Sequence, residues 1–150
     1  MSIFGHDKQG RKNLPIFFFM TRYFPKALVE LTRVCVAGNA QHNPELPLFD
    51  IHWARDKSTD QLNTALRHMM DHEISGPFDT EPPEVIAAIN TLYGDQHSTY
   101  HLAKAAWRIL AALELQIEAD QAKIYTEEGA FQCPYPFPID NRKSPLDPPQ

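Results

Sequence analysis

The stretch from Arg22 to Asn43 (RYFPKALVELTRVCVAGNAQHN) constrains the fold most, because its apolar residues recur at helical spacing. Pro25 suits the first turn of a helix, where the N–H that proline lacks would have no partner. Gly38 suits the position just past a helix end, because glycine adopts the left-handed conformation without a steric penalty. The stretch therefore predicts a helix that begins near Pro25 and ends at Gly38.

Glu30 lies on or beside the apolar stripe of this helix, since Ala27 and Val34 are its neighbours about one turn away. A carboxylate in that position has to be paired, hydrogen-bonded or bound to a cation. The residues leave two interpretations open. Glu30 holds a cation in a polar site, or it lies at the edge of the face and forms a salt bridge with Arg33.

Three further helices are expected, over about 58–74, 80–94 and 95–124. The first opens on a capping box of Ser58 and Gln61. The apolar stripes expected to face the core are Leu62, Leu66 and Met69 on that helix, and Leu102, Ala106, Ile109, Leu110, Leu113 and Ile117 on the last one.

A line of small residues on the last helix, Ala105 and Ala112, flanks His101 and Arg108. Small side chains leave room either for a ligand or for close packing of another helix. Both interpretations stay open at this point. The length of the last helix favours a role in a dimer or tetramer interface.

The two ends of the chain carry no helical pattern. Residues 1–14 predict an irregular arm, and the apolar run Ile16–Met20 either docks as an extended segment or covers a partner subunit. Residues 129–150 hold six of the 13 prolines, which predicts an extended tail. The sequence thus predicts one all-α domain over residues 1–150, with a core of about 22–126 folded as two packed helical hairpins.

The composition limits the possible partners and compartments. A formal net charge of −5 argues against binding to nucleic acid or to an anionic membrane. The longest apolar run is too short to span a bilayer, and the two cysteines, Cys35 and Cys133, give no disulfide framework. We therefore expect a cytoplasmic protein.

Seven histidines are many for 150 residues. Two pairs, His68/His72 and His97/His101, have the i, i+4 spacing that zinc sites use on helices. The alternative is that each imidazole makes a single hydrogen bond. The acidic residues that complete a candidate polar cluster are Glu30, Asp71, Asp79 and Glu81.

Four segments carry a resemblance: the stretch 22–43, then HWARDK, ALRHMMDHE and HLAKAAWRILAALEL. In this order they resemble the phage dATP/dGTP diphosphohydrolases, a MazG-like all-α family, over roughly residues 22–118. The resemblance implies hydrolysis of dGTP and dATP to the deoxynucleoside monophosphate and pyrophosphate. It also implies two or three Mg²⁺ or Mn²⁺ ions and a homodimer or homotetramer. In the host cytoplasm, such an enzyme would supply dGMP for 2-aminoadenine synthesis by a phage.

The resemblance further implies a set of site residues. The catalytic groups are Glu30, His68 and His101; the metal ligands are Glu30, His68, Asp71 and Asp79; the substrate-binding groups are Asn39, Trp53, Arg67 and Lys104. The E-E-x-x-E and E-x-x-D motifs of the wider MazG superfamily are missing. At the place that resembles E-x-x-D, this chain reads His101-Leu102-Ala103-Lys104.

Two other functions fit the same residues. A non-catalytic, histidine-rich helical module would bind zinc through the two i, i+4 pairs or act as an interaction protein. Release of intact triphosphate, as by histidine-aspartate phosphohydrolases, is disfavoured because His68 and Asp71 are not adjacent.

Overall fold

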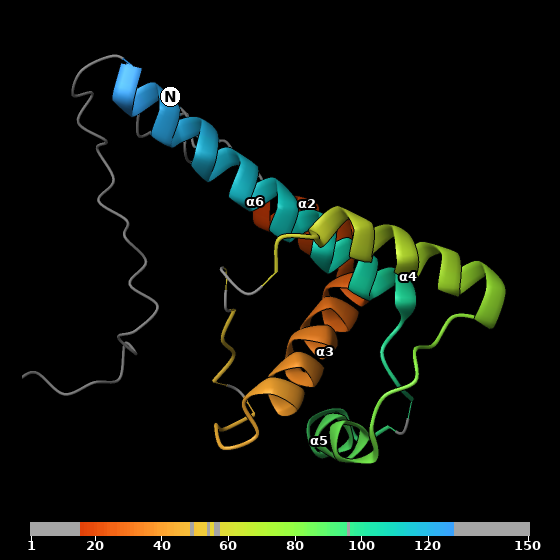
Figure 1. Cartoon of the computed structure of the whole chain (residues 1–150). Helices are drawn as coiled ribbons and strands as arrows, with labels where there is room; N and C mark the ends of the chain where they lie inside the picture. The colour runs from red at the N-terminus through yellow and green to blue at the C-terminus, as the bar shows by residue number, and fades with distance from the viewer. Residues whose placement is uncertain (1–15, 49, 54, 56–57, 96, 128–150) are drawn as a thin grey trace, which may run out of the picture.

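The computed structural model describes residues 16–48, 50–53, 55, 58–95 and 97–127, with side chains as far as residue 122. The expected N-terminal arm and proline-rich tail lie outside these residues. The helices are α2 (Ile16–Tyr23), α3 (Pro25–His42), α4 (Gln61–Ser75), α5 (Pro83–Tyr93) and α6 (His101–Glu127), as Figure 1 shows. An isolated antiparallel bridge joins Phe78 to Tyr100. The all-α prediction is confirmed.

The helices pack as two pairs, α4 with α6 and α3 with α5, and α3 also contacts α6. Contacts between α4 and α6 join Gln61 to Arg108 and His68 to His101, so these two helices run antiparallel. α6 continues from Arg108 to Glu127, about 28 Å of helix beyond the first residue of α4. Figure 1 shows this second half of α6 extending away from the other helices.

A small apolar core lies between α3 and α5. Ala37, Val85 and Ile89 form it, with Ala40 and Tyr93 packed against them. Pro83 begins α5, and Gly94 ends it in the left-handed conformation with φ +71°. The helix expected over about 80–94 is thus confirmed at its end but begins later than expected, with Pro82 as the residue that precedes it.

Several expected boundaries are wrong. Gly38 lies inside α3, which continues to His42; the backbone N–H of the next residue, Asn43, donates to the carbonyl of Asn39. The run Ile16–Met20 is part of a helix, so the expectation of an extended segment is wrong; its alternative role as a cover for a partner subunit stays a prediction. α4 begins at Gln61, and the Gln61 amide donates to the carbonyl of Ser58.

The start of α6 is also wrong. Residues 97–100 are not helical, because they pair with the segment that follows α4. The His101 N–H donates to Pro77 O, and the Asp79 N–H donates to Thr99 O, both at 2.9 Å. His97 and His101 therefore do not share a helix face. These pairings are between residues distant in the sequence, which helical periodicity does not report.

The predicted core-facing stripes are wrong for α4 and α6. Six side chains, each between 46% and 65% exposed, form what we call the apolar face: Leu62, Leu66 and Met69 on α4, and Leu102, Ile109 and Leu113 on α6. The residues between the two helices, the inward rows, are instead polar or small: Gln61, Ala65 and His68 on α4, and His101, Ala105 and Arg108 on α6. Of the two small residues of α6, Ala105 is buried between the helices, which fits close helix packing, whereas Ala112 lines a pocket.

Candidate metal centre

Two segments distant in the sequence bring the polar residues of the inward rows together. α4 supplies His68, and α6 begins with His101. The non-helical segment between α4 and α5 supplies Asp79, whose backbone N–H is fixed to Thr99 O. The backbone bonds around Phe78 and Tyr100 therefore determine where Asp79 and His101 lie relative to each other.

The three side chains converge on one point. The Nδ1 atoms of His68 and His101 are 3.2 Å apart, and a carboxylate oxygen of Asp79 completes a group whose ligand atoms lie within 4.8 Å of one another. Both imidazoles are buried, at 9% and 4% exposed. Among the residues that the structure describes, this is a group with the composition and spacing of a metal site.

The donor set fits a divalent cation. Two imidazole nitrogens bound to one ion at about 2.1 Å lie roughly 3–3.4 Å apart, close to the spacing found here. Carboxylate ligands suit Mg²⁺ and Mn²⁺, whereas imidazoles suit transition metals. Two histidines and one aspartate therefore favour Mn²⁺ or a similar transition-metal ion over Mg²⁺.

The protonation states also suit a cation site. Burial, with a further contribution from the Lys104 ammonium, lowers the pKa of His68 and so favours the neutral imidazole, whose Nδ1 atom is hydrogen-bonded to Nδ1 of His101. Burial opposes ionisation of Asp79, but the hydrogen bond and charge of Lys104 outweigh it and hold the pKa of Asp79 below its usual value. Both groups are thus in their ligating forms near neutral pH.

Lys104 lies next to this group, one turn along α6 from His101. Its ammonium contacts Asp79 Oδ2 at 2.5 Å and Glu81 Oε1 at 2.7 Å. The Glu81 side chain is only 4% exposed and also accepts a hydrogen bond from the Thr99 hydroxyl. The Lys104 ammonium is therefore held by two carboxylates.

Glu30 lies elsewhere. Its carboxylate accepts a hydrogen bond from Arg33 Nε at 3.0 Å, and the same guanidinium makes a bidentate pair with Asp95 at 2.7 and 2.8 Å. The salt-bridge interpretation of Glu30 is the one that the structure shows. Glu30 and Asp71 are not members of the metal group found among the described residues.

The remaining expected residues have separate surroundings. Asn39 is buried; its amide donates to Pro47 O and accepts from Asn43, so it holds the loop after α3. Trp53 packs edge-on against Trp107 at 5.6 Å, with the guanidinium of Arg55 over its ring. Arg67 is exposed on α4.

The other two histidines of the expected pairs do not join the group. His97 lies 3.4 Å from Asp95 and packs against Phe78. His72 remains on α4, and its Nδ1 atom is buried without a hydrogen-bond partner among the described residues. A four-histidine zinc site is therefore not assembled.

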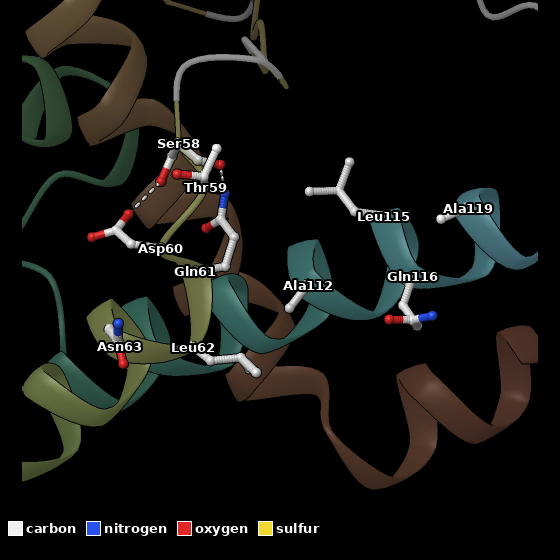
Figure 2. Close-up of a pocket in the computed structure, with 10 residues that line it drawn as sticks. All are labelled: Ser58, Thr59, Asp60, Gln61, Leu62, Asn63, Ala112, Leu115, Gln116 and Ala119. Atoms are coloured by element: carbon white, nitrogen blue, oxygen red, sulfur yellow. Dashed lines mark hydrogen bonds between the residues drawn. The ribbon is translucent and has the colours of Figure 1, made fainter.

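A pocket of about 350 Å³ lies at the start of α4, where α6 continues past it (Figure 2). Residues 58–63 line one side, and Ala112, Leu115, Gln116 and Ala119 line the other. None of the metal group lines it. The Arg108 guanidinium donates to two of the lining residues, Ser58 and Gln61.

The sequence left the functional roles of Glu81 and Thr99 unassigned. The spacing of Asp79 and Glu81 could have indicated that their carboxylates lie close together, because residues i and i+2 of an extended segment point to the same side. The approach of Lys104 to both carboxylates depends on the pairing of residues 77–79 with 99–101, which the local sequence does not show.

The fold and the site define a class: an all-α protein in which His68 and His101, from two antiparallel helices, meet Asp79 in a candidate metal group. Residues 5–124 match the family described as dATP/dGTP diphosphohydrolase, N-terminal. The match covers most of the chain, so the protein belongs to this family. A search of curated proteins and a search of solved structures each found no match. None of the described helices combines the length and apolar character needed to cross a membrane.

Proposed function

We propose that this protein hydrolyses dGTP and dATP to the monophosphate and pyrophosphate, with a divalent metal ion, Mn²⁺ or Mg²⁺, as cofactor. In a phage-infected cell this reaction supplies dGMP for 2-aminoadenine synthesis and acts in the host cytoplasm. Family membership supports the substrate class. The observation that carries the proposal is the convergence of His68, Asp79 and His101 at one buried point.

The chemistry follows from the donor set. A bound divalent ion neutralises phosphate oxygens and lowers the pKa of a coordinated water. His68, Asp79 and His101 hold that ion, and the buried position of both imidazoles keeps their orientation fixed. Arg67, the exposed residue that precedes His68 on α4, is the group we assign to the phosphates.

The test is product analysis. Each dNTP is incubated with the full chain and Mn²⁺, and the products are separated to distinguish pyrophosphate from triphosphate. We expect dGMP and dAMP with pyrophosphate. Asp79→Asn and His101→Ala should lower turnover about 100-fold or more, since even outer-shell changes at metal sites cost 10–100-fold.

A matched control is His52→Ala, because His52 is exposed and pairs with Asp50 away from the metal group. Its turnover should equal that of the wild type. Release of triphosphate, or a folded protein that binds metal without turnover of any dNTP, contradicts the proposal. The second outcome is the one expected of a structural metal-binding module.

We also propose that the protein works as a homodimer, or as a homotetramer built from such dimers, in which the apolar faces of two copies pack together. On each helix, a residue of the apolar face comes one position after a residue of the inward row. It therefore points about 100° away from that row around the helix axis. Because α4 and α6 are antiparallel, the same offset brings both stripes to the same side of the pair. α3 lies on the opposite side of α6, where Cys35 contacts Trp107, the residue that precedes Arg108.

The shape of this face favours a second copy as its occupant. α4 is 15 residues long, so the two helices present an area roughly 22 Å long and 20 Å wide. A two-fold axis through it makes a four-helix bundle with an apolar centre. The projecting half of α6 extends the contact toward the roughly 800 Å² per subunit of a stable interface.

Sedimentation analysis tests the dimer. Leu66→Glu and Ile109→Glu place charges in the apolar face and should give monomers. Leu92→Glu is the matched control, since Leu92 is 47% exposed on α5 and outside the face. A wild-type chain that sediments as a monomer at tens of micromolar contradicts the proposal.

A further inference from the structure

Lys104 occupies an unusual place for a cationic side chain in a candidate metal centre. Its ammonium lies between Asp79 and Glu81, at 2.5 and 2.7 Å, and its side chain is 19% exposed. Glu81 is held in turn by the hydroxyl of Thr99, whose residue is fully buried. The ammonium is thus enclosed by fixed acceptors rather than directed into solvent.

The arrangement follows the layout of a two-metal centre. In such centres two ions lie about 3.5–4 Å apart and share ligands between them. Asp79 takes the shared position here, because its carboxylate belongs to the histidine group and also contacts Lys104. Glu81 contacts the same ammonium but does not belong to the histidine group, as expected of a residue that would bind a second ion alone.

The charges lead to the same interpretation. Asp79 and Glu81 together carry two negative charges, and Lys104 compensates one of them permanently. One divalent ion at the histidine group is then enough to compensate the remaining negative charge of the two carboxylates. A second divalent ion beside Asp79 would lie in the place of the ammonium and be repelled by it.

We propose that Lys104 takes the place of a second metal ion, so that each chain binds a single divalent ion at His68, Asp79 and His101. This inference rests on the metal centre of the proposed function and narrows its ion count to one. Lys104 is a positioning residue: it fixes the shared carboxylate and supplies the second positive charge from the chain itself.

The test counts Mn²⁺ ions bound by the full chain without nucleotide, by titration calorimetry and by the spin-resonance signal of free Mn²⁺. The wild type should bind one ion per chain. Lys104→Gln should bind two, because the Asp79–Glu81 site is then open. Lys104→Arg retains the charge and should bind one, as should the surface control Lys26→Gln.

A double variant, Lys104→Gln with Glu81→Gln, should return to one ion, since the second ion loses its outer ligand. Two ions in the wild type, or one ion in a folded Lys104→Gln, overturns the role of Lys104. If Lys104→Gln does not fold, the number of Mn²⁺ ions bound by the wild type decides the question: one ion supports the inference and two ions overturn it. Two wild-type ions together with dGTP turnover overturn only this inference, whereas failure to bind Mn²⁺ overturns the proposed function as well.

Discussion

Arg33 is a buried cation with partners on three sides. Asp95 receives both terminal nitrogens, Glu30 receives Nε, and the ring of Tyr93 lies 4.2 Å from the guanidinium carbon. Burial opposes the charge, but Asp95 and Glu30 outweigh it and raise the pKa of Arg33. This one side chain therefore connects α3 to the end of α5 and the segment after it.

Replacement of Arg33 by methionine should destabilise the fold. The side chain is 2% exposed, and its hydrogen bonds to charged groups are lost, so we expect the free energy of unfolding to fall by about 1–3 kcal/mol. Urea denaturation measures it. Arg22→Met, on the exposed surface of α2, is the control and should change little. Equal stability of the two variants would contradict a structural role for Arg33.

The Arg33–Asp95 pair also predicts a pH dependence. The hydrogen bonds from Arg33 hold the pKa of Asp95 below its usual value. The stabilisation is therefore complete above the unfolded-state pKa of about 3.9, and it is lost as the pH falls through the folded-state pKa. Wild type and Asp95→Asn should differ most in thermal stability at pH 7, and the difference should shrink as the pH falls below about 4. A difference that stays the same from pH 7 to about pH 2 would show that the charge of Asp95 is not responsible.

At the scale of single residues, the sequence identified His68, Asp79 and His101 as candidates but could not group them. Residue type and spacing showed that these side chains can bind a cation. Which of them meet depends on the pairing of residues 77–79 with 99–101. The sequence also left two interpretations of Glu30, a cation site or a salt bridge with Arg33, because it does not show which residues meet in space. The structure places Asp95 beside the same guanidinium, and Arg33 binds both carboxylates.

At the scale of helices, periodicity found the four main segments but not the faces that they bury. The longer apolar side chains of α4 and α6 remain exposed, because the two helices meet through polar and small residues. Hydrophobic periodicity shows that a helix has an apolar and a polar side. It does not show whether the apolar side packs against the same chain or against another one.

Two glycines in helical segments should respond oppositely to alanine. Gly38 lies within α3, and an added Cβ meets nothing within 4 Å, so Gly38→Ala should stabilise the protein by about 0.5–1 kcal/mol. Gly94 ends α5 at φ +71°, so Gly94→Ala should cost about 1–2 kcal/mol. Thermal unfolding of both variants checks the pair. Stabilisation by Gly94→Ala would contradict the end of α5 described here.

At the scale of the whole molecule, the exposed apolar face predicts a melting temperature that depends on protein concentration. Association stabilises the folded state by mass action, so dilution should lower the melting temperature of the wild type. Calorimetry over a hundredfold range of concentration measures this dependence. Leu66→Glu should remove it, and Leu92→Glu should retain it. A wild-type melting temperature that is the same at every concentration would contradict the dimer.

The short pairing between residues 77–79 and 99–101 has a consequence for how such a chain can vary. The intervening residues, α5 included, leave the candidate metal centre after Asp79 and return to it before His101. Their number can therefore change through insertion or deletion while Asp79 and His101 keep their separation. Related chains are expected to be able to differ in length at α5 and still present His68, Asp79 and His101 as the same candidate ligands.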